Sequence, residues 1–92
     1  MGQNGAYILK GYGQIDPEWA RAFLGLFKTR QVNIRRLVFL QTDLSKKDAM
    51  LEIHFFPPGG EECSAFLALL EDHLLLQNWR HRTLESLSEK SS

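Results

Sequence analysis

One change of pattern constrains the fold most: within a single stretch, apolar residues switch from helical spacing to a strand-like run. Over residues 19–27 they recur every three or four positions, which is typical of an amphipathic helix. Asp16 and Pro17 begin that helix, because Asp accepts from a free backbone N–H and Pro lacks the donor that would be unused there. The chain then becomes β-branched and aromatic. The stretch therefore predicts a helix at residues 17–30 and a strand at residues 35–42.

Residues 49–56 give the clearest strand. Leu51, Ile53 and Phe55 fall on one face and more polar side chains on the other, so one face is expected to be covered and the other open. The remaining expected elements are strands at residues 6–13 and 74–79, a polar connection at residues 43–48 and a helix that begins at Glu61.

The resulting order, β-α-β-β-α-β, predicts an α/β (α+β) fold. It is a ferredoxin-like sandwich, in which a four-stranded antiparallel sheet carries two helices on one face. A length of 92 residues corresponds to one domain. We expect a short lead at residues 1–5, the domain at residues 6–82, and a flexible tail at residues 83–92, where Ser, Glu and Lys dominate.

Charge and cysteine content exclude several classes of protein. Eleven Lys and Arg balance eleven Asp and Glu, so no overall field attracts nucleic acid or an acidic membrane. Cys63 is the only cysteine, which rules out an intrachain disulfide and a cysteine-based metal cluster. We expect no signal peptide, because the first residues lack a basic region followed by an apolar run, and no membrane span. These features predict a cytoplasmic protein.

No group of residues forms a recognisable catalytic or metal-binding set. His54 lies beside Glu52 on the open face of its strand but lacks a third partner nearby in sequence, so we expect a solvated histidine. His73 and His81 do not have the spacing of metal ligands. Nucleophile-elbow and phosphate-loop motifs are absent. We therefore expect no catalytic residues, no metal and no cofactor.

An RNA-recognition module has the same order of elements and is the first alternative. Such a module stacks bases on aromatic side chains of its central strands, whereas this chain offers Glu52 and His54 there. The chain has a basic pair at residues 35–36 and a basic run at residues 79–82, but its net charge is zero, which argues against a nucleic-acid surface. Arg35 and Arg36 are expected to be solvated or to pair across a subunit contact, and the role of residues 79–82 stays open.

Three local features resemble the ACT domain, and specifically the small regulatory subunit of acetolactate synthase (acetohydroxyacid synthase). Residues 25–27 are the Gly-Leu-Phe found late in the first helix of that family, and residues 30–34 resemble its Arg-Gly-aromatic-Asn-Ile. The step of sixteen residues from Pro17 to Asn33 equals the family spacing. The likeness extends more loosely over most of residues 6–82, so we expect a single ACT-like unit without the second domain of longer small subunits.

This resemblance implies a function. It implies a non-catalytic subunit that binds and activates the large, thiamine-diphosphate-dependent acetolactate synthase subunit in branched-chain amino-acid biosynthesis. It also implies a homodimer with an amino-acid effector between two copies. The positions implied for the effector are Gln14, Ile15, Asp16, Pro17, Glu18, Asn33 and Ile34. Of these, Pro17, Asn33 and Ile34 match the family motif, and the others occupy its loop.

The loop departs from the family's Asn-x-Pro-Gly, because Ile15 replaces the Asn and Glu18 replaces the Gly. Asp16 and Glu18 are explained first as helix caps. Their charges would repel an effector carboxylate, so we expect weak valine binding and a gain in the variant Glu18→Gly. Two other functions remain open: a stand-alone ACT homodimer that senses an amino acid, and a dimeric scaffold without a ligand. A homodimer is expected in each case, because an isolated sheet has unpaired edge strands.

Overall fold

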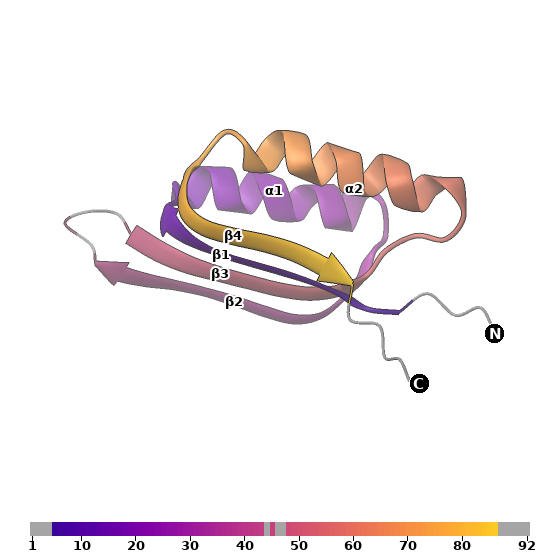
Figure 1. Cartoon of the computed structure of the whole chain (residues 1–92), viewed down its shortest axis with the longest axis horizontal. Coiled ribbons are helices and arrows are strands. Elements are labelled where there is room, and N and C mark those ends of the chain that lie inside the picture. Colours follow the sequence, from indigo (N-terminus) through magenta and orange to yellow (C-terminus); the bar gives the residue numbers. More distant parts are fainter. Residues whose placement is uncertain (1–4, 44, 46–47, 87–92) are drawn as a thin grey trace.

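The computed structural model describes residues 5–43, 45 and 48–86. The elements are β1 (Tyr7–Gln14), α1 (Pro17–Thr29), β2 (Asn33–Asp43), β3 (Asp48–Phe56), α2 (Glu61–Leu74) and β4 (Asn78–Ser86). The strands form one antiparallel sheet in the order β2-β3-β1-β4, so β2 and β4 are its edges. Both helices lie on the same face (Figure 1). The predicted ferredoxin-like βαββαβ sandwich is confirmed.

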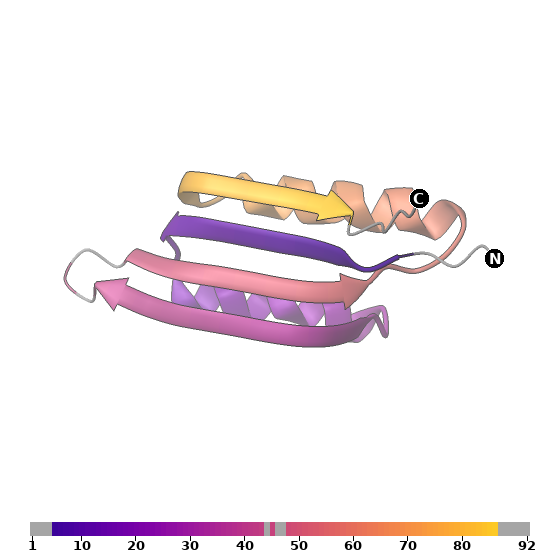
Figure 2. The ribbon, with the colours of Figure 1, turned by 60° about the horizontal axis from the view of Figure 1, so that its bottom comes forward.

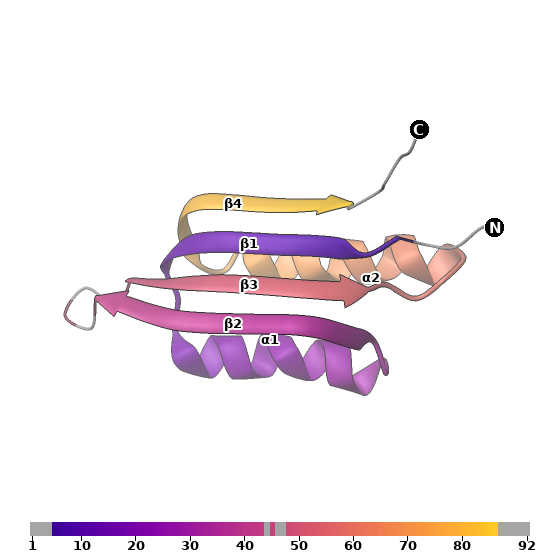
Figure 3. The same ribbon diagram turned by 90° about the horizontal axis from the view of Figure 1, so that it is seen from below.

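The two helices divide the covered face between them. α1 lies on the side of β2 and β3, and α2 lies on the side of β1 and β4 (Figures 2 and 3). The opposite face of the sheet has no helix over it in the part of the chain that the structure describes (Figure 3). We call this the open face.

The start and end of α1 both follow from its sequence. Asp16 caps the helix: its Oδ1 accepts from the Glu18 amide at 3.4 Å, and Pro17 takes the first helical position. After the helix, Gln31 adopts a left-handed backbone with φ of 57°. Its amide donates to the Lys28 carbonyl at 3.0 Å, which stops the helix and turns the chain into β2. Gln31 stands where the Arg-Gly-aromatic-Asn-Ile pattern has glycine, the residue that adopts this conformation most readily.

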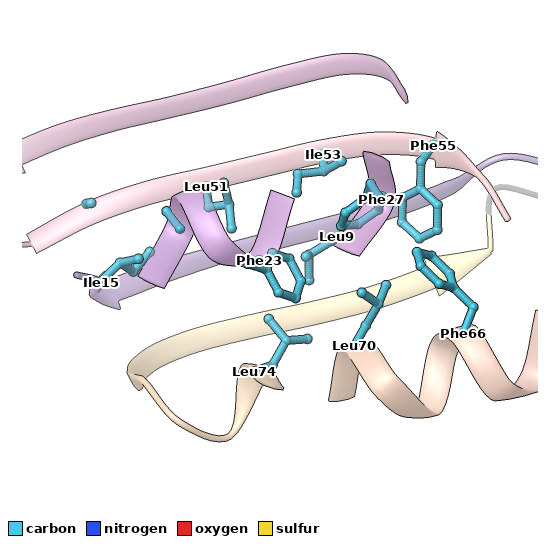
Figure 4. Close-up of a cluster of buried hydrophobic side chains, with 12 residues drawn as sticks. Leu9, Ile15, Phe23, Phe27, Leu51, Ile53, Phe55, Phe66, Leu70 and Leu74 are labelled. Carbon is cyan, nitrogen blue, oxygen red and sulfur yellow. The ribbon is translucent and has the colours of Figure 1, made fainter. Parts of the chain in front are cut away.

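The core fills the space between the sheet and the helices. Leu51, Ile53 and Phe55 are buried on the covered face of β3, as the alternation predicted. Phe27 of α1 and Phe66 of α2 meet Phe55 edge-on, with ring centroids 5.1 and 6.0 Å from it, a favourable arrangement for aromatic pairs (Figure 4). The remaining buried apolar residues are Leu9, Ile15, Ala20, Phe23, Ala49, Leu70 and Leu74.

The last strand lies further along the chain than predicted. The prediction of a strand at residues 74–79 was wrong, because Leu74 ends α2 and is fully buried in the core (Figure 4). Leu75 and Leu76 are exposed in the turn that follows. β4 then continues to Ser86, so residues 83–86 belong to the sheet rather than to the predicted tail. Residues 87–92 and three of the six residues of the predicted 43–48 connection (44, 46 and 47) lie outside the described residues.

Candidate functional site

The loop that leads into α1 is held by the turn before β4. The Asp16 amide donates to Gln77 Oε1 at 2.9 Å, and Gln77 Nε2 donates to the carbonyl of Leu76 at 3.0 Å. Together with its capping bond to Glu18, Asp16 therefore joins the helix start to the end of α2. One amide of the first turn is used by this cap, so fewer free donors remain for a bound anion.

A cavity of about 480 Å³ opens beside this loop. Its lining residues are Gln14, Ile15, Asp16, Ser45, Leu76, Gln77 and Asn78. Three of the predicted effector positions, Gln14, Ile15 and Asp16, thus border one cavity. Ile15 contributes little to its surface, because its side chain is fully buried in the core.

The charge of this cavity follows from its lining. Asp16 is the single charged side chain among the described lining residues. A carboxylate at the mouth of a cavity favours the ammonium group of a ligand and opposes a carboxylate. The cavity therefore binds the carboxylate of an amino acid less well than an uncapped helix start would, because the backbone amides of an uncapped start are free to donate.

The other predicted effector positions lie elsewhere. Pro17 and Glu18 are exposed on α1 and do not line the cavity. Asn33 pairs with Phe56 at one end of β3, whereas Gln14 pairs with Asp48 at the other end. Since a strand rises about 3.3 Å per residue, roughly 26 Å of β3 separates the two groups. A single chain does not bring Asn33 and Ile34 to the start of α1.

Residues 76–78 complete the cavity and were missed by sequence reasoning. They were assigned to a strand, which would have turned alternate side chains away from the loop. The Gln77-Asn78 pair could have indicated a turn here, because side-chain amides are common in turns, where they form hydrogen bonds to the neighbouring backbone.

A second polar group lies on the open face. His54 Nε2 and Glu52 Oε2 are 2.6 Å apart, and the two side chains are 25% and 21% exposed. His54 is therefore partly exposed on the open face, where a solvated histidine was expected, but it also contacts Glu52, because the two residues lie two positions apart on one face of β3. The hydrogen bond to His54 lowers the pKa of Glu52, opposed by burial and assisted by the positive charge of Lys10.

The basic run at residues 79–82 is divided among separate contacts. Trp79 packs edge-on against Trp19 and donates its indole N–H to the carbonyl of Leu74. Arg80 lies 3.5 Å from the buried carboxylate of Asp48, and Arg82 lies 2.7 Å from the exposed carboxylate of Glu71. These partners neutralise both guanidinium groups, so the run is not a free cationic surface.

The described residues were also compared with the requirements of a metal site and of a membrane-spanning helix. Among them, no three His, Cys, Asp or Glu side chains gather closely enough to hold a metal ion. Within the same residues, neither helix has the length and apolar character needed to cross a membrane. Cys63 is a free, half-buried cysteine on α2.

Comparison with known proteins supports the fold. No protein-family model matches the chain, and no curated protein matches it. A formyltetrahydrofolate deformylase from Pseudomonas putida KT2440 superposes with a TM-score of 0.67 at 11% identity, over 88% of this chain. The chain spans 28% of the length of that deformylase. The C-terminal domain of the MgtC protein from Mycobacterium tuberculosis superposes with a TM-score of 0.63 at 16% identity, over 90% of this chain and 87% of that domain. This chain therefore shares a ferredoxin-like fold with these two structures.

Proposed function

We propose that this chain is a non-catalytic regulatory domain that acts as a homodimer and binds and activates the large catalytic subunit of acetolactate synthase. The chemistry on thiamine diphosphate would belong to that subunit. A small amino acid would be the effector, bound between two copies near the start of α1. The proposal combines the ACT-like fold with the local resemblance over residues 17–34.

One observation carries the proposal: the two halves of the expected effector site lie at opposite ends of the sheet, with Asn33 on the edge strand β2 and Gln14 on the central strand β1. β2 is an edge strand of eleven residues, with Asn33 at one end and Asp43 at the other. Asp43 and Gln14 both pair with Asp48, so α1 begins at the Asp43 end. If two copies pair antiparallel along β2 about an axis near Val38, Asn33 of one copy approaches the α1 start of the other. In this arrangement the proposed site would be complete only in the dimer.

The side chains of β2 support such pairing. Leu37 is 45% exposed and Leu40 is 53% exposed, one on each face of this edge strand. Natural edge strands are usually protected by charged residues or proline. The exposed apolar side chains of Leu37 and Leu40 lie beyond the charged pair Arg35–Arg36, and such a stretch is typical of an edge strand that pairs with a second copy.

Sedimentation equilibrium at micromolar concentration tests this arrangement. We expect a dimer, and we expect Leu37→Lys combined with Leu40→Lys to dissociate it, because like charges would face each other across the two-fold axis. Leu75→Lys is the matched control, since Leu75 is 71% exposed in the α2–β4 turn, away from β2. A monomeric unmodified protein, or equal dissociation by the control, would contradict pairing along β2.

A stand-alone sensor of an amino acid is the second candidate. It is favoured by the cavity of about 480 Å³, which is formed within one chain and needs no enzyme partner. In that case the protein would bind a ligand and change its assembly without activating acetolactate synthase. Ligand binding in the absence of co-elution with a large subunit would favour this candidate.

A further inference from the structure

We propose that Arg35, Arg36 and His54 form a separate binding site for a phosphate-type dianion on the open face of the sheet. They line a cavity of about 380 Å³ together with Ala6. His54 lies near the Phe56 end of β3, whereas α1 begins beside the Asp48 end. The site is therefore at the other end of the sheet from the proposed effector cavity.

A β-bulge creates the arrangement. Ile34 pairs with Phe55 and Arg36 pairs with His54, which leaves Arg35 as an extra residue in β2. In a regular strand, neighbouring side chains point to opposite faces. A bulge redirects a side chain, and here both successive arginines line one cavity. The local irregularity thus places two guanidinium groups on the same side of the sheet.

Within the part of the chain that the structure describes, these two arginines differ from Arg80 and Arg82 in forming no ion pair with a carboxylate. Arg80 and Arg82 each form an ion pair. Among residues 5–43, 45 and 48–86, neither Arg35 nor Arg36 lies within ion-pair distance of an acidic side chain. Arg35 is instead held over the ring of Phe56, 5.6 Å from the ring centroid. Stacking on a ring leaves the N–H groups at the guanidinium edge able to donate.

His54 is positioned by Glu52. Nε2 donates to the Glu52 carboxylate in the 2.6 Å contact, so Nδ1 is the ring nitrogen left for a ligand. Nδ1 donates to a phosphate oxygen only from the imidazolium form, because Nδ1 of the neutral ring is an acceptor. The charged groups around the histidine are Glu52 and Lys10 on the central strands and Arg36 on β2. A further carboxylate, that of Glu85, lies beyond Ile8 on the same face, in a cavity that Lys10 also lines. With Arg35, three cations and two carboxylates give this part of the open face a net positive charge, although the whole chain has zero net charge.

This donor set selects the class of ligand. A guanidinium presents parallel N–H groups that match two oxygens of a phosphate or carboxylate. Two such groups with one imidazolium suit a tetrahedral dianion with several acceptor oxygens, and Ala6 is the single apolar residue among the described lining residues. The shared chemistry is a phosphate dianion, which inorganic phosphate and a phosphomonoester would both supply.

Titration calorimetry of the full chain tests the site, with the ionic strength held constant by NaCl. The ligands are inorganic phosphate, glycerol 3-phosphate and, as a monocarboxylate comparison, acetate. We expect both phosphates to bind and acetate to bind more weakly. Tighter binding of glycerol 3-phosphate than of inorganic phosphate identifies a phosphomonoester as the source, and the reverse identifies the free ion.

Substitutions locate the binding. Arg35→Gln and Arg36→Gln are each expected to weaken phosphate binding by about tenfold, since a hydrogen bond to a charged group is lost. Arg21→Gln makes the same change of charge on the exposed side of α1 and is expected to leave the affinity unchanged. In NMR spectra, phosphate should also shift the His54 ring signals of the unmodified protein. No binding of either phosphate at millimolar concentration, or equal weakening by all three variants, would overturn the proposal.

Discussion

The indole ring of Trp79 lies against the backbone of Gly11: a β-carbon added at Gly11 would stand 2.2 Å from Trp79 Cζ3. The same indole meets the ring of Trp19 edge-on at 6.0 Å and donates to the carbonyl of Leu74. Trp79 therefore connects β4 with β1, α1 and the end of α2. Glycine is required at position 11 because the ring occupies the space of a side chain.

Gly11→Ala is expected to lower the free energy of unfolding by about 1–3 kcal/mol, the usual cost of overpacking. Gly25→Ala is the matched control, because a β-carbon there meets nothing within 4 Å. Since Gly25 lies within α1, alanine should raise the stability by up to about 1 kcal/mol. Urea unfolding of both variants measures the contrast. Equal stability of Gly11→Ala and the unmodified protein would show that Trp79 does not occupy this position.

Gln31→Gly is expected to stabilise the fold. Gln31 has a φ of 57°, and the left-handed conformation costs a residue with a side chain about 1–2 kcal/mol. Glycine removes this cost but gains freedom in the unfolded chain, so a net gain of about 0.5–1 kcal/mol is expected. Thermal or urea unfolding measures it. A loss of stability would mean that the Gln31 side chain contributes more than its backbone conformation costs.

The Glu52–His54 pair predicts a dependence of stability on pH. The pKa of Glu52 is lowered from its usual value of 4.5 by the hydrogen bond to His54. A carboxyl with a lowered pKa in the fold stabilises it above the unfolded pKa, and that contribution is lost as the pH falls through the folded pKa. Glu52→Gln should therefore be less stable than the unmodified protein at pH 6 and equally stable in acid below the folded pKa.

Glu85→Gln, an exposed carboxylate of β4, is the control for this prediction. Its stability difference from the unmodified protein should stay small over the same pH range. A Glu52→Gln difference that does not change with pH would contradict an electrostatic role for the pair.

Asp16 is expected to weaken the binding of amino acids at the α1 start. Asp16→Asn removes the charge but keeps a side-chain oxygen that caps the helix. We expect it to strengthen valine binding by about 1 kcal/mol, roughly fivefold. Glu18→Gly should give a smaller gain, because Glu18 does not line the cavity. Titration calorimetry with valine measures the affinities of the unmodified protein, Asp16→Asn and Glu18→Gly. Tight valine binding by the unmodified protein would refute the argument from charge.

Much of the fold could be predicted from the sequence because its strongest patterns are local. The Asp16-Pro17 start and the alternation from Leu51 to Phe55 report burial directly. β4 was misplaced because it is an edge strand of mostly polar residues, whereas the leucines before it suggested a strand. Leu74 is the last residue of α2 and is buried in the core, whereas Leu75 lies in the exposed turn that follows. The two leucines differ only because α2 ends between them, and the local sequence does not specify that end.

The candidate site was harder to predict. The sequence identified the loop at Gln14 and Asp16, but Gln77 reaches it from far along the chain. The bulge at Arg35 depends on the register between β2 and β3, which no local pattern specifies. Asn33 and Ile34 belong to the site only if a second copy is present, and one chain cannot bring them to α1.

The rate of acetolactate formation by the purified large subunit from the same organism, with and without this chain, tests the proposed regulatory function most directly. We predict that the chain alone forms no acetolactate, that adding it raises the rate of the large subunit, and that the two proteins co-elute in size-exclusion chromatography. An unchanged rate without co-elution would contradict a role as an acetolactate synthase subunit.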